Sequence, residues 1–244
     1  MLRNSIRFAA PHLADNEIHI WSAALERAPR ELEKLSAVLS ADEQARAERF
    51  RFQRDQEHFI AARGILRHVL AAYLHRQAAE LRFAYSPSRK PALADADPGG
   101  LCFNLSHSHG LAVYAMTRHR EIGVDVERLR SDFPCERIAE RFFSPREFSK
   151  LRSLPEALRI EAFFNCWTRK EAYIKAIGTG LFMALDRFEV SLAPEDPAAL
   201  LNVEDDPQEA SRWTIESFLP APGYVGAVAV KDRGLTVKSW RWKE

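Results

Sequence analysis

The sequence predicts an α+β fold, in which two similar α+β halves pack face to face and place a ligand site at the seam between them. The length of 244 residues suffices for one large domain or two modest ones. An approximate repeat at a spacing of about a hundred residues divides the chain into residues 1–119 and 120–244. In each half an arginine-phenylalanine pair (Arg49-Phe50, Arg141-Phe142) precedes a long amphipathic helix opening at residues 57–60 or 161–164. Chance similarity between two amphipathic helices is the alternative explanation.

Hydrophobic patterning predicts the elements of the first half. A short strand is expected at residues 18–21 and a helix at 25–38. Ser40, before two acidic residues, is typical of a helix N-cap. A longer helix should span about 56–74, and the Pro- and Gly-containing breaks at 86–88 and 98–100 should precede strands at 101–105 and 111–117.

The second half should begin with a strand over residues 122–126, because apolar and polar residues alternate there. A helix should carry residues 167–175 and end at Gly178. Two apolar strands are then predicted at 187–192 and 224–230, and a surface loop is predicted at 192–208. Residues 235–242 could form an edge strand.

The composition indicates an ordinary globular protein in a reducing compartment. The hydrophobic share is 46%, the charged share 28% and the formal net charge +1, which implies no bulk attraction to nucleic acid or a membrane. Cys102, Cys135 and Cys166 are odd in number and widely spaced, so they indicate neither a disulfide framework nor a metal site. Without a signal-like or membrane-spanning apolar run, we expect a cytoplasmic protein, and we expect a monomer.

The acidic strand is the strongest chemical signal. Alternation directs Ile122, Val124 and Val126 to a core and Asp125 and Glu127 to the opposite face. Two carboxylates on one face repel each other unless a cation joins them.

Glu171 and Lys175 lie one turn apart on the predicted helix of the same half. If this helix packs beside the acidic strand, three carboxylates and an ammonium converge into a site for a hard divalent cation and a phosphorylated ligand. The alternative is an ordinary surface pair between Glu171 and Lys175.

Basic residues gather in the first half. Between residues 44 and 90 they outnumber acidic residues, and Arg46 and Lys90 are among them. Such a surplus could bind an anion or could be a solvated helix face. Pro91 fixes the backbone beside Lys90. Ser106 and His107 follow a predicted strand, where a polar turn could hold a phosphate or be no more than a hairpin turn.

Five motifs in this order resemble the Sfp-type 4′-phosphopantetheinyl transferases. The similarity extends from about residue 40 to residue 192. The pair Gly-Val-Asp-Val-Glu and Trp-x-x-Lys-Glu-Ala-x-x-Lys is highly specific at this separation. The matching stretches are residues 89–91, 104–108, 123–127, 141–144 and 167–181.

The resemblance implies a pseudodimer with its active site at the seam. It implies an enzyme that moves the phosphopantetheine arm of coenzyme A to a serine of an acyl or peptidyl carrier protein and releases 3′,5′-ADP. Asp125, Glu127 and Glu171 would hold Mg²⁺, and Lys175 would approach the pyrophosphate. Glu171 and Lys175 are the expected catalytic residues. The expected contacts to coenzyme A are Arg46, Lys90, Pro91, Ser106, His107 and Lys175.

One position departs from the family pattern, in which Gly usually precedes the Lys-Pro pair. This chain has Arg89 there, and because Arg does not readily adopt positive φ, we expect the turn to differ locally.

Two rival functions stay open at this stage. One is a non-enzymatic module that binds coenzyme A or a carrier, and the other is a Mg²⁺-dependent nucleotide pyrophosphatase. Leu129, Phe133, Phe142 and Phe143 could contact a carrier or could belong to the core.

Overall fold

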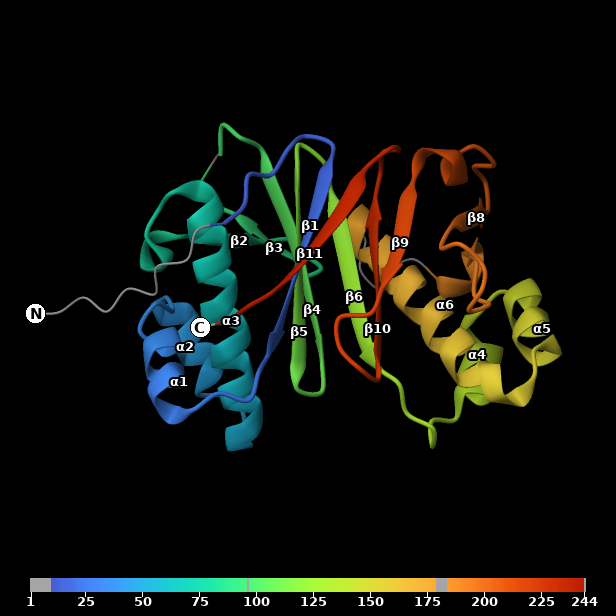
Figure 1. Ribbon diagram of the computed structural model, residues 1–244, viewed down its shortest axis with the longest axis horizontal. Helices are drawn as coiled ribbons and strands as arrows, with labels where there is room; N and C mark the ends of the chain where they lie inside the picture. Colours follow the sequence, from blue (N-terminus) through green and yellow to red (C-terminus); the bar gives the residue numbers. More distant parts are fainter. Residues whose placement is uncertain (1–9, 96, 179–183, 244) are drawn as a thin grey trace, which may run out of the picture.

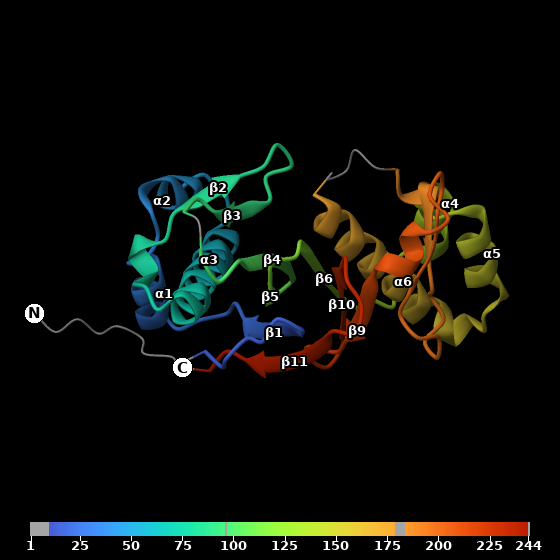
Figure 2. The same cartoon turned by 90° about the horizontal axis from the view of Figure 1, so that it is seen from above.

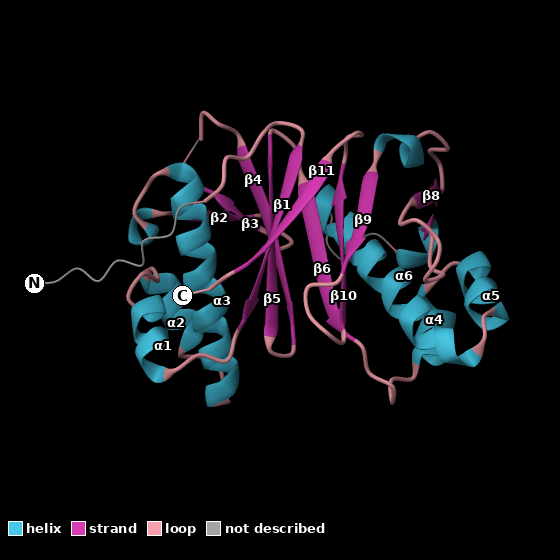
Figure 3. Ribbon diagram, in the orientation of Figure 1, coloured by secondary structure: helices cyan, strands magenta, loops and turns pink. Residues whose placement is uncertain are grey.

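The computed structural model describes residues 10–95, 97–178 and 184–243 of the chain. It is a mixed fold in which helices lie at the two ends and strands occupy the centre (Figure 1; Figure 3). The second glycine of the motif at residues 178–180 lies outside the described residues. Among the residues described, no helix is long and apolar enough to cross a membrane.

The first half of the chain contains three helices and five strands in its described part. In chain order these are β1 (Glu17–Ala24), α1 (Pro29–Ser36), α2 (Ala41–Ala47), α3 (Gln53–Leu74), β2 (Phe83–Tyr85), β3 (Pro91–Leu93), β4 (Leu101–Ser108) and β5 (Leu111–Arg118).

The second half continues with β6 (Ile122–Arg128), α4 (Cys135–Phe142), α5 (Pro145–Ser153), α6 (Glu156–Ile177), β7 (Phe188–Val190), β8 (Leu200–Val203), β9 (Thr214–Phe218), β10 (Tyr224–Val230) and β11 (Thr236–Arg241).

Two antiparallel three-strand units form the centre. One has the order β1-β5-β4 and the other β6-β10-β9. Each unit is accompanied by a helix of 22 residues, α3 in the first half and α6 in the second. Both helices end on a left-handed C-cap residue, His75 and Gly178 respectively. The two halves therefore share helix length, helix ending and strand order.

Apolar side chains fill the space between the two strand units. Ile18 and Ile20 on β1 join Ile122, Val124 and Val126 on β6 in one buried cluster. The predicted inward face of the acidic strand is thus confirmed. The core that it faces is the seam between the halves.

Each half also contains a buried ion pair at a helix start. Glu43 at the start of α2 accepts from Arg67 of α3 at 2.6 Å, and Glu147 at the start of α5 accepts from Lys170 of α6 at 2.8 Å. Both carboxylates also accept from the backbone of the N-cap residue, Ser40 or Ser144. Each cation further donates to two backbone carbonyls in the segment that follows its helix, so it has compensating partners for its burial.

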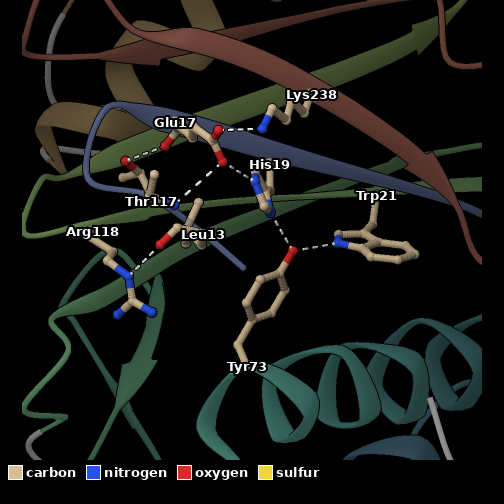
Figure 4. Close-up of polar contacts among 9 residues, drawn as sticks. Leu13, Glu17, His19, Trp21, Tyr73, Thr117, Arg118 and Lys238 are labelled. Carbon is tan, nitrogen blue, oxygen red and sulfur yellow. Dashed lines mark hydrogen bonds and ion pairs between the residues drawn. The ribbon is translucent and has the colours of Figure 1, made fainter. Parts of the chain in front are cut away.

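Strand β11 crosses from the second half to the first. It is confirmed as an edge strand, and it pairs in parallel with β1. Glu17 on β1 contacts Lys238 and accepts from buried His19, whose other ring nitrogen lies 2.7 Å from the Tyr73 hydroxyl (Figure 4). The predicted division of the chain after residue 119 therefore assigns β11 to the second half, although this strand belongs to the sheet of the first half.

Several predicted element boundaries were wrong. The helix expected at 25–38 begins only at Pro29, because the residue before a proline disfavours helical backbone and proline suits the first helical position. The strand expected at 187–192 is limited to Phe188–Val190, after a short 3₁₀ turn. The loop expected at 192–208 contains β8, which pairs with β7.

The apolar residues considered for a carrier surface pack largely into the second half. Phe143 is 4% exposed, and Leu129, Phe133 and Phe142 are partly buried against the same core. Phe142 meets the ring of Trp167 edge-on. Their contacts favour the core interpretation.

Candidate active site

The acidic strand and helix α6 approach each other at Gly123. A Cβ atom at this position would overlap the carbonyl oxygen of Ala172 and the amide nitrogen of Ala176, both backbone atoms of α6. Only glycine permits this approach. The close packing brings the helix that carries Glu171 and Lys175 beside the strand that carries Asp125 and Glu127, as the sequence predicted.

Asp125 is the centre of the polar contacts. It is 4% exposed, and its Oδ1 accepts from the Lys175 ammonium at 2.6 Å and from the Ser106 hydroxyl at 2.8 Å. Lys175 also donates to the Ser106 Oγ at 3.1 Å. Strand β4 of the first half and helix α6 of the second therefore meet at one carboxylate. The alternative surface pair of Glu171 with Lys175 is wrong, because the ammonium is directed to Asp125.

Two further side-chain hydrogen bonds connect strands β4 and β6 on either side of Asp125. The Val124 amide donates to the Asn104 side-chain oxygen at 2.9 Å, and the Ser108 hydroxyl donates to Glu127 at 2.7 Å. Ser106 and Ser108 thus hold one carboxylate each. These side chains fix the register between an edge strand of each half.

The two remaining carboxyl groups are destabilised in their ionised form. Burial raises the pKa of Glu171, and the charges of Asp125 and Glu127 raise it further, while Lys175 opposes this shift. Burial also raises the pKa of Glu127, against the hydrogen bond from Ser108. A carboxylate with a raised pKa is a better proton acceptor near neutral pH.

The donor chemistry of this group suits a hard divalent cation. Asp125 Oδ2 is buried and has no hydrogen-bond partner among the described residues, and a buried unpaired carboxylate oxygen is costly without a cation. However, no three His, Cys, Asp or Glu side chains in the described part of the chain are assembled as a metal cluster. The assignment of Asp125, Glu127 and Glu171 to one Mg²⁺ stays a prediction.

A cavity of about 430 Å³ lies beside these carboxylates. Both halves line it, since Lys175 and Gly178 belong to the α6 region and the other lining residues belong to the first half. All six residues predicted to contact coenzyme A line it: Arg46, Lys90, Pro91, Ser106, His107 and Lys175. The structure brings together residues that lie up to about 130 positions apart in the chain, as a seam site requires.

The cavity is strongly cationic. Its lining includes Arg46, Arg63, Arg89, Lys90 and Lys175, and no carboxylate among the described lining residues. His107 faces this space, and the pKa of its ring is lowered by burial and by the Lys175 charge, so the imidazole is neutral near pH 7. The arrangement suits a ligand with several phosphate groups.

Two lining residues, Arg63 and Tyr85, were missed by the sequence interpretation. Arg63 is buried, pairs with Glu43 at 3.0 Å and donates to the Tyr85 hydroxyl. The available signal was Arg63 and Arg67 one turn apart in an otherwise apolar helix segment, which requires a buried acidic partner.

The turn before Lys90 keeps its positive φ despite the missing glycine. Arg89 has φ 62°, and its amide donates to the Ser86 carbonyl at 2.8 Å. We expected the turn to differ because Arg replaces the usual Gly. That expectation is wrong for the backbone, since Arg89 adopts the left-handed conformation that Gly would favour. Lys90 is held by an ion pair of 2.8 Å with Glu121, at the entry to β6.

The hairpin that carries this turn reaches the second half. β2, β3 and the C-terminal end of α6 lie on the same side of the sheets (Figure 2). The Ser88 hydroxyl donates to the Gly178 carbonyl at 3.1 Å.

Family models match both halves of this site. Residues 24–119 match the 4′-phosphopantetheinyl transferase N-terminal model, and residues 121–229 match the 4′-phosphopantetheinyl transferase superfamily model. The chain belongs to this superfamily. The predicted family and enzyme class, a 4′-phosphopantetheinyl transferase that moves the arm of coenzyme A to a carrier protein, are thereby confirmed.

Curated relatives agree with the family models. The chain is 42% identical over 231 residues to the 4′-phosphopantetheinyl transferase HetI of Nostoc sp., with 94% of each chain covered. It is 30% identical to the transferase psf-1 of Bacillus pumilus, with 84% of each covered. It is 28% identical to the transferase Sfp of Bacillus subtilis, with 81% of this chain and 84% of the relative covered.

Among solved structures, the holo-[acyl-carrier-protein] synthase of Thermotoga maritima is 24% identical with a TM-score of 0.37. The alignment covers 46% of this chain and 62% of that one.

Proposed function

We propose that this phosphopantetheinyl transferase is Mg²⁺-dependent and works at the seam of a pseudodimer, with both halves contributing to one active site. The observation that carries the proposal is the position of Lys175, whose ammonium contacts Asp125 while its side chain lines the cationic cavity. One residue thus joins the carboxylates to the space for the nucleotide. The shared strand order and the paired 22-residue helices support the pseudodimer.

The cavity would bind the nucleotide part of coenzyme A. Arg46, Lys90, Ser106 and His107 would contact its phosphates, with Pro91 fixing the backbone beside Lys90. A neutral His107 can donate one N–H to a phosphate oxygen. Lys175 would lie at the pyrophosphate, where its positive charge stabilises the leaving group.

Transfer forms a bond between the carrier serine oxygen and the phosphorus that bears the pantetheine arm. The bond from that phosphorus to 3′,5′-ADP breaks, and the serine proton passes to a carboxylate, for which Glu171 is our candidate. Its raised pKa supports this role. Asp125, Glu127 and Glu171 would hold Mg²⁺, which supplies charge neutralisation for the departing 3′,5′-ADP.

The test is mass spectrometry of an apo carrier protein incubated with the chain, coenzyme A and Mg²⁺. A mass gain of one phosphopantetheine arm is expected. Asp125→Ala, Glu127→Ala and Glu171→Ala should each abolish it while the protein stays folded. The matched control is Glu216→Ala, an exposed carboxylate on β9 of the same sheet, which should transfer normally.

Two outcomes would contradict the proposal. Unchanged mass for fatty-acid, polyketide and peptide carriers alike would favour a binding module. Release of phosphopantetheine without any carrier would favour a pyrophosphatase. We further propose that the protein acts as a cytoplasmic monomer, without nucleic-acid or membrane partners. Gel filtration of the purified chain would test whether it is a monomer.

A further inference from the structure

Two serine side chains connect the hairpin of β2 and β3 to the end of α6 (Figure 2). The Ser88 hydroxyl donates to the Gly178 carbonyl at 3.1 Å, and the Oγ atoms of Ser86 and Ser88 lie 2.8 Å apart. The Lys90 amide donates to the Ser86 Oγ at 3.1 Å. Three consecutive hydrogen bonds, here called the serine chain, therefore run from the backbone of Lys90 in the first half to helix α6 of the second half.

The Gly178 carbonyl fixes the direction of the serine chain. A hydroxyl has one proton to donate, and a carbonyl can only accept. Because Ser88 donates to Gly178, it accepts from Ser86, which in turn accepts from the Lys90 amide. Carbonyls at the C-terminal end of a helix lack a partner within the helix, so the Gly178 carbonyl is available to Ser88. Each hydroxyl both accepts and donates in the chain, so the loss of either one interrupts it.

The hairpin separates two spaces. β2 and β3 form a two-stranded sheet of their own. A second hollow of about 700 Å³ shares four lining residues with the cavity proposed for the nucleotide: Tyr85, Lys90, Pro91 and Gly178. With a space on either side, the tip of the hairpin has room to move unless polar contacts hold it.

Lys90 is anchored to the second half twice. Its backbone amide begins the serine chain that ends on α6, and its ammonium lies 2.8 Å from Glu121, directly before β6. The Glu121 side chain is 72% exposed, so solvent weakens this ion pair. The serine chain is part-buried and neutral, so salt does not screen it. Of the two anchors, the serine chain therefore restrains Lys90 more strongly.

We propose that Ser86 and Ser88 are positioning residues for nucleotide binding, which hold Lys90 at a fixed separation from the last turn of α6. Lys175 lies in that turn and lines the same cavity as Lys90. The serine chain thus sets the separation of two cations from opposite halves. A ligand with phosphates at two points binds more tightly when this separation is constant, because less binding free energy is lost in ordering the hairpin. This inference rests on the proposed binding of coenzyme A, with Lys90 as a phosphate contact.

Titration calorimetry with 3′,5′-ADP tests the role of Ser88, since it requires neither a carrier nor turnover. Ser88→Ala removes the donor to Gly178 and should raise Kd about two- to tenfold, as for one neutral hydrogen bond. Ser88→Thr keeps a hydroxyl and should bind like wild type. The matched control is Ser153→Ala, which removes a hydroxyl that donates to the Lys150 carbonyl at the end of α5 and should leave Kd unchanged.

Dependence on Lys90 distinguishes positioning from a general effect on structure. If Ser88 acts through Lys90, Ser88→Ala should cause no further loss of affinity in the Lys90→Ala background. In carrier labelling, Ser88→Ala should raise KM for coenzyme A about two- to tenfold and change kcat less than about twofold.

An unchanged Kd in folded Ser88→Ala, or an equal loss with and without Lys90, would overturn the inference. A wild type that does not bind 3′,5′-ADP would overturn it together with the proposed function. If wild type labels no carrier while the loss in Ser88→Ala still depends on Lys90, the proposed function fails and the inference stands.

Discussion

Gly123→Ala should damage the site through backbone packing alone, without removing any polar group. The added methyl would overlap two backbone atoms of α6, which cannot rotate away as a side chain would. Relief requires the strand that carries Asp125 and the helix that carries Lys175 to separate. Overpacking of this kind costs about 1–3 kcal/mol, and we expect the upper end because backbone meets backbone. For a chain of this length, 3 kcal/mol corresponds to a fall in Tm of about 6–12 °C.

The Gly123→Ala variant should also lose activity under conditions where it remains folded. A displacement of about 1 Å between reacting groups can lower turnover about a hundredfold. The matched control is Gly64→Ala on α3, whose Cβ would lie 2.6 Å from the Leu35 Cβ and 2.8 Å from the Leu35 carbonyl oxygen, and which meets no element that carries a carboxylate of the site. It should be destabilised comparably but keep near-normal kcat when folded.

Both variants should be assayed for carrier labelling at a temperature where circular dichroism shows them folded. Wild-type kcat in Gly123→Ala would refute the reasoning that this approach positions the site. An equal fall in kcat for Gly64→Ala would refute it as well, since packing strain anywhere would then suffice.

Three further predictions concern the buried titratable groups. Lys170→Met leaves the buried Glu147 carboxylate without its cation and should lower the free energy of unfolding by about 3–5 kcal/mol in urea titration; an unchanged midpoint would show that the pair is dispensable. Because burial raises the pKa of Glu171, its carboxyl group in the metal-free protein should titrate above its ordinary 4.5 in carbon-13 NMR, and a titration at or below 4.5 would contradict the raised pKa that supports Glu171 as base. Burial lowers the pKa of His19 below 6.5, so its contribution to stability is complete above pH 6.5 and is lost as pH falls toward the folded-state pKa. His19→Gln should therefore make Tm depend less on pH below pH 6.5, and an unaltered curve of Tm against pH would contradict this role of His19.

The local arrangement of the candidate site could be predicted from the sequence better than the element boundaries. Alternation along β6 predicted that Asp125 and Glu127 share one face, and helical spacing predicted that Glu171 and Lys175 lie one turn apart, because each pattern depends only on local geometry. Tertiary packing decides which carboxylate Lys175 contacts. Helical spacing favours Glu171, but packing at Gly123 brings Asp125 to the ammonium instead.

Other features required the folded chain. The parallel pairing of β11 with β1 joins residues more than two hundred positions apart, and no local pattern specifies it. The turn before Lys90 accommodates Arg89 in a left-handed conformation in place of the usual glycine, because hydrogen bonds hold the turn. The sequence alone does not reveal these hydrogen bonds. The role of Arg63 depended on Glu43, a residue of another helix.

A nucleotide site shared by the two halves is tested most directly by a double-mutant cycle on 3′,5′-ADP binding, measured by titration calorimetry. The cycle uses His107→Ala from the first half and Lys175→Ala from the second. Because the two side chains line one cavity and the Lys175 charge lowers the pKa of His107, their effects should deviate from additivity by at least about 0.5 kcal/mol. Strictly additive losses, or no loss in either single variant, would contradict a nucleotide site shared by the two halves.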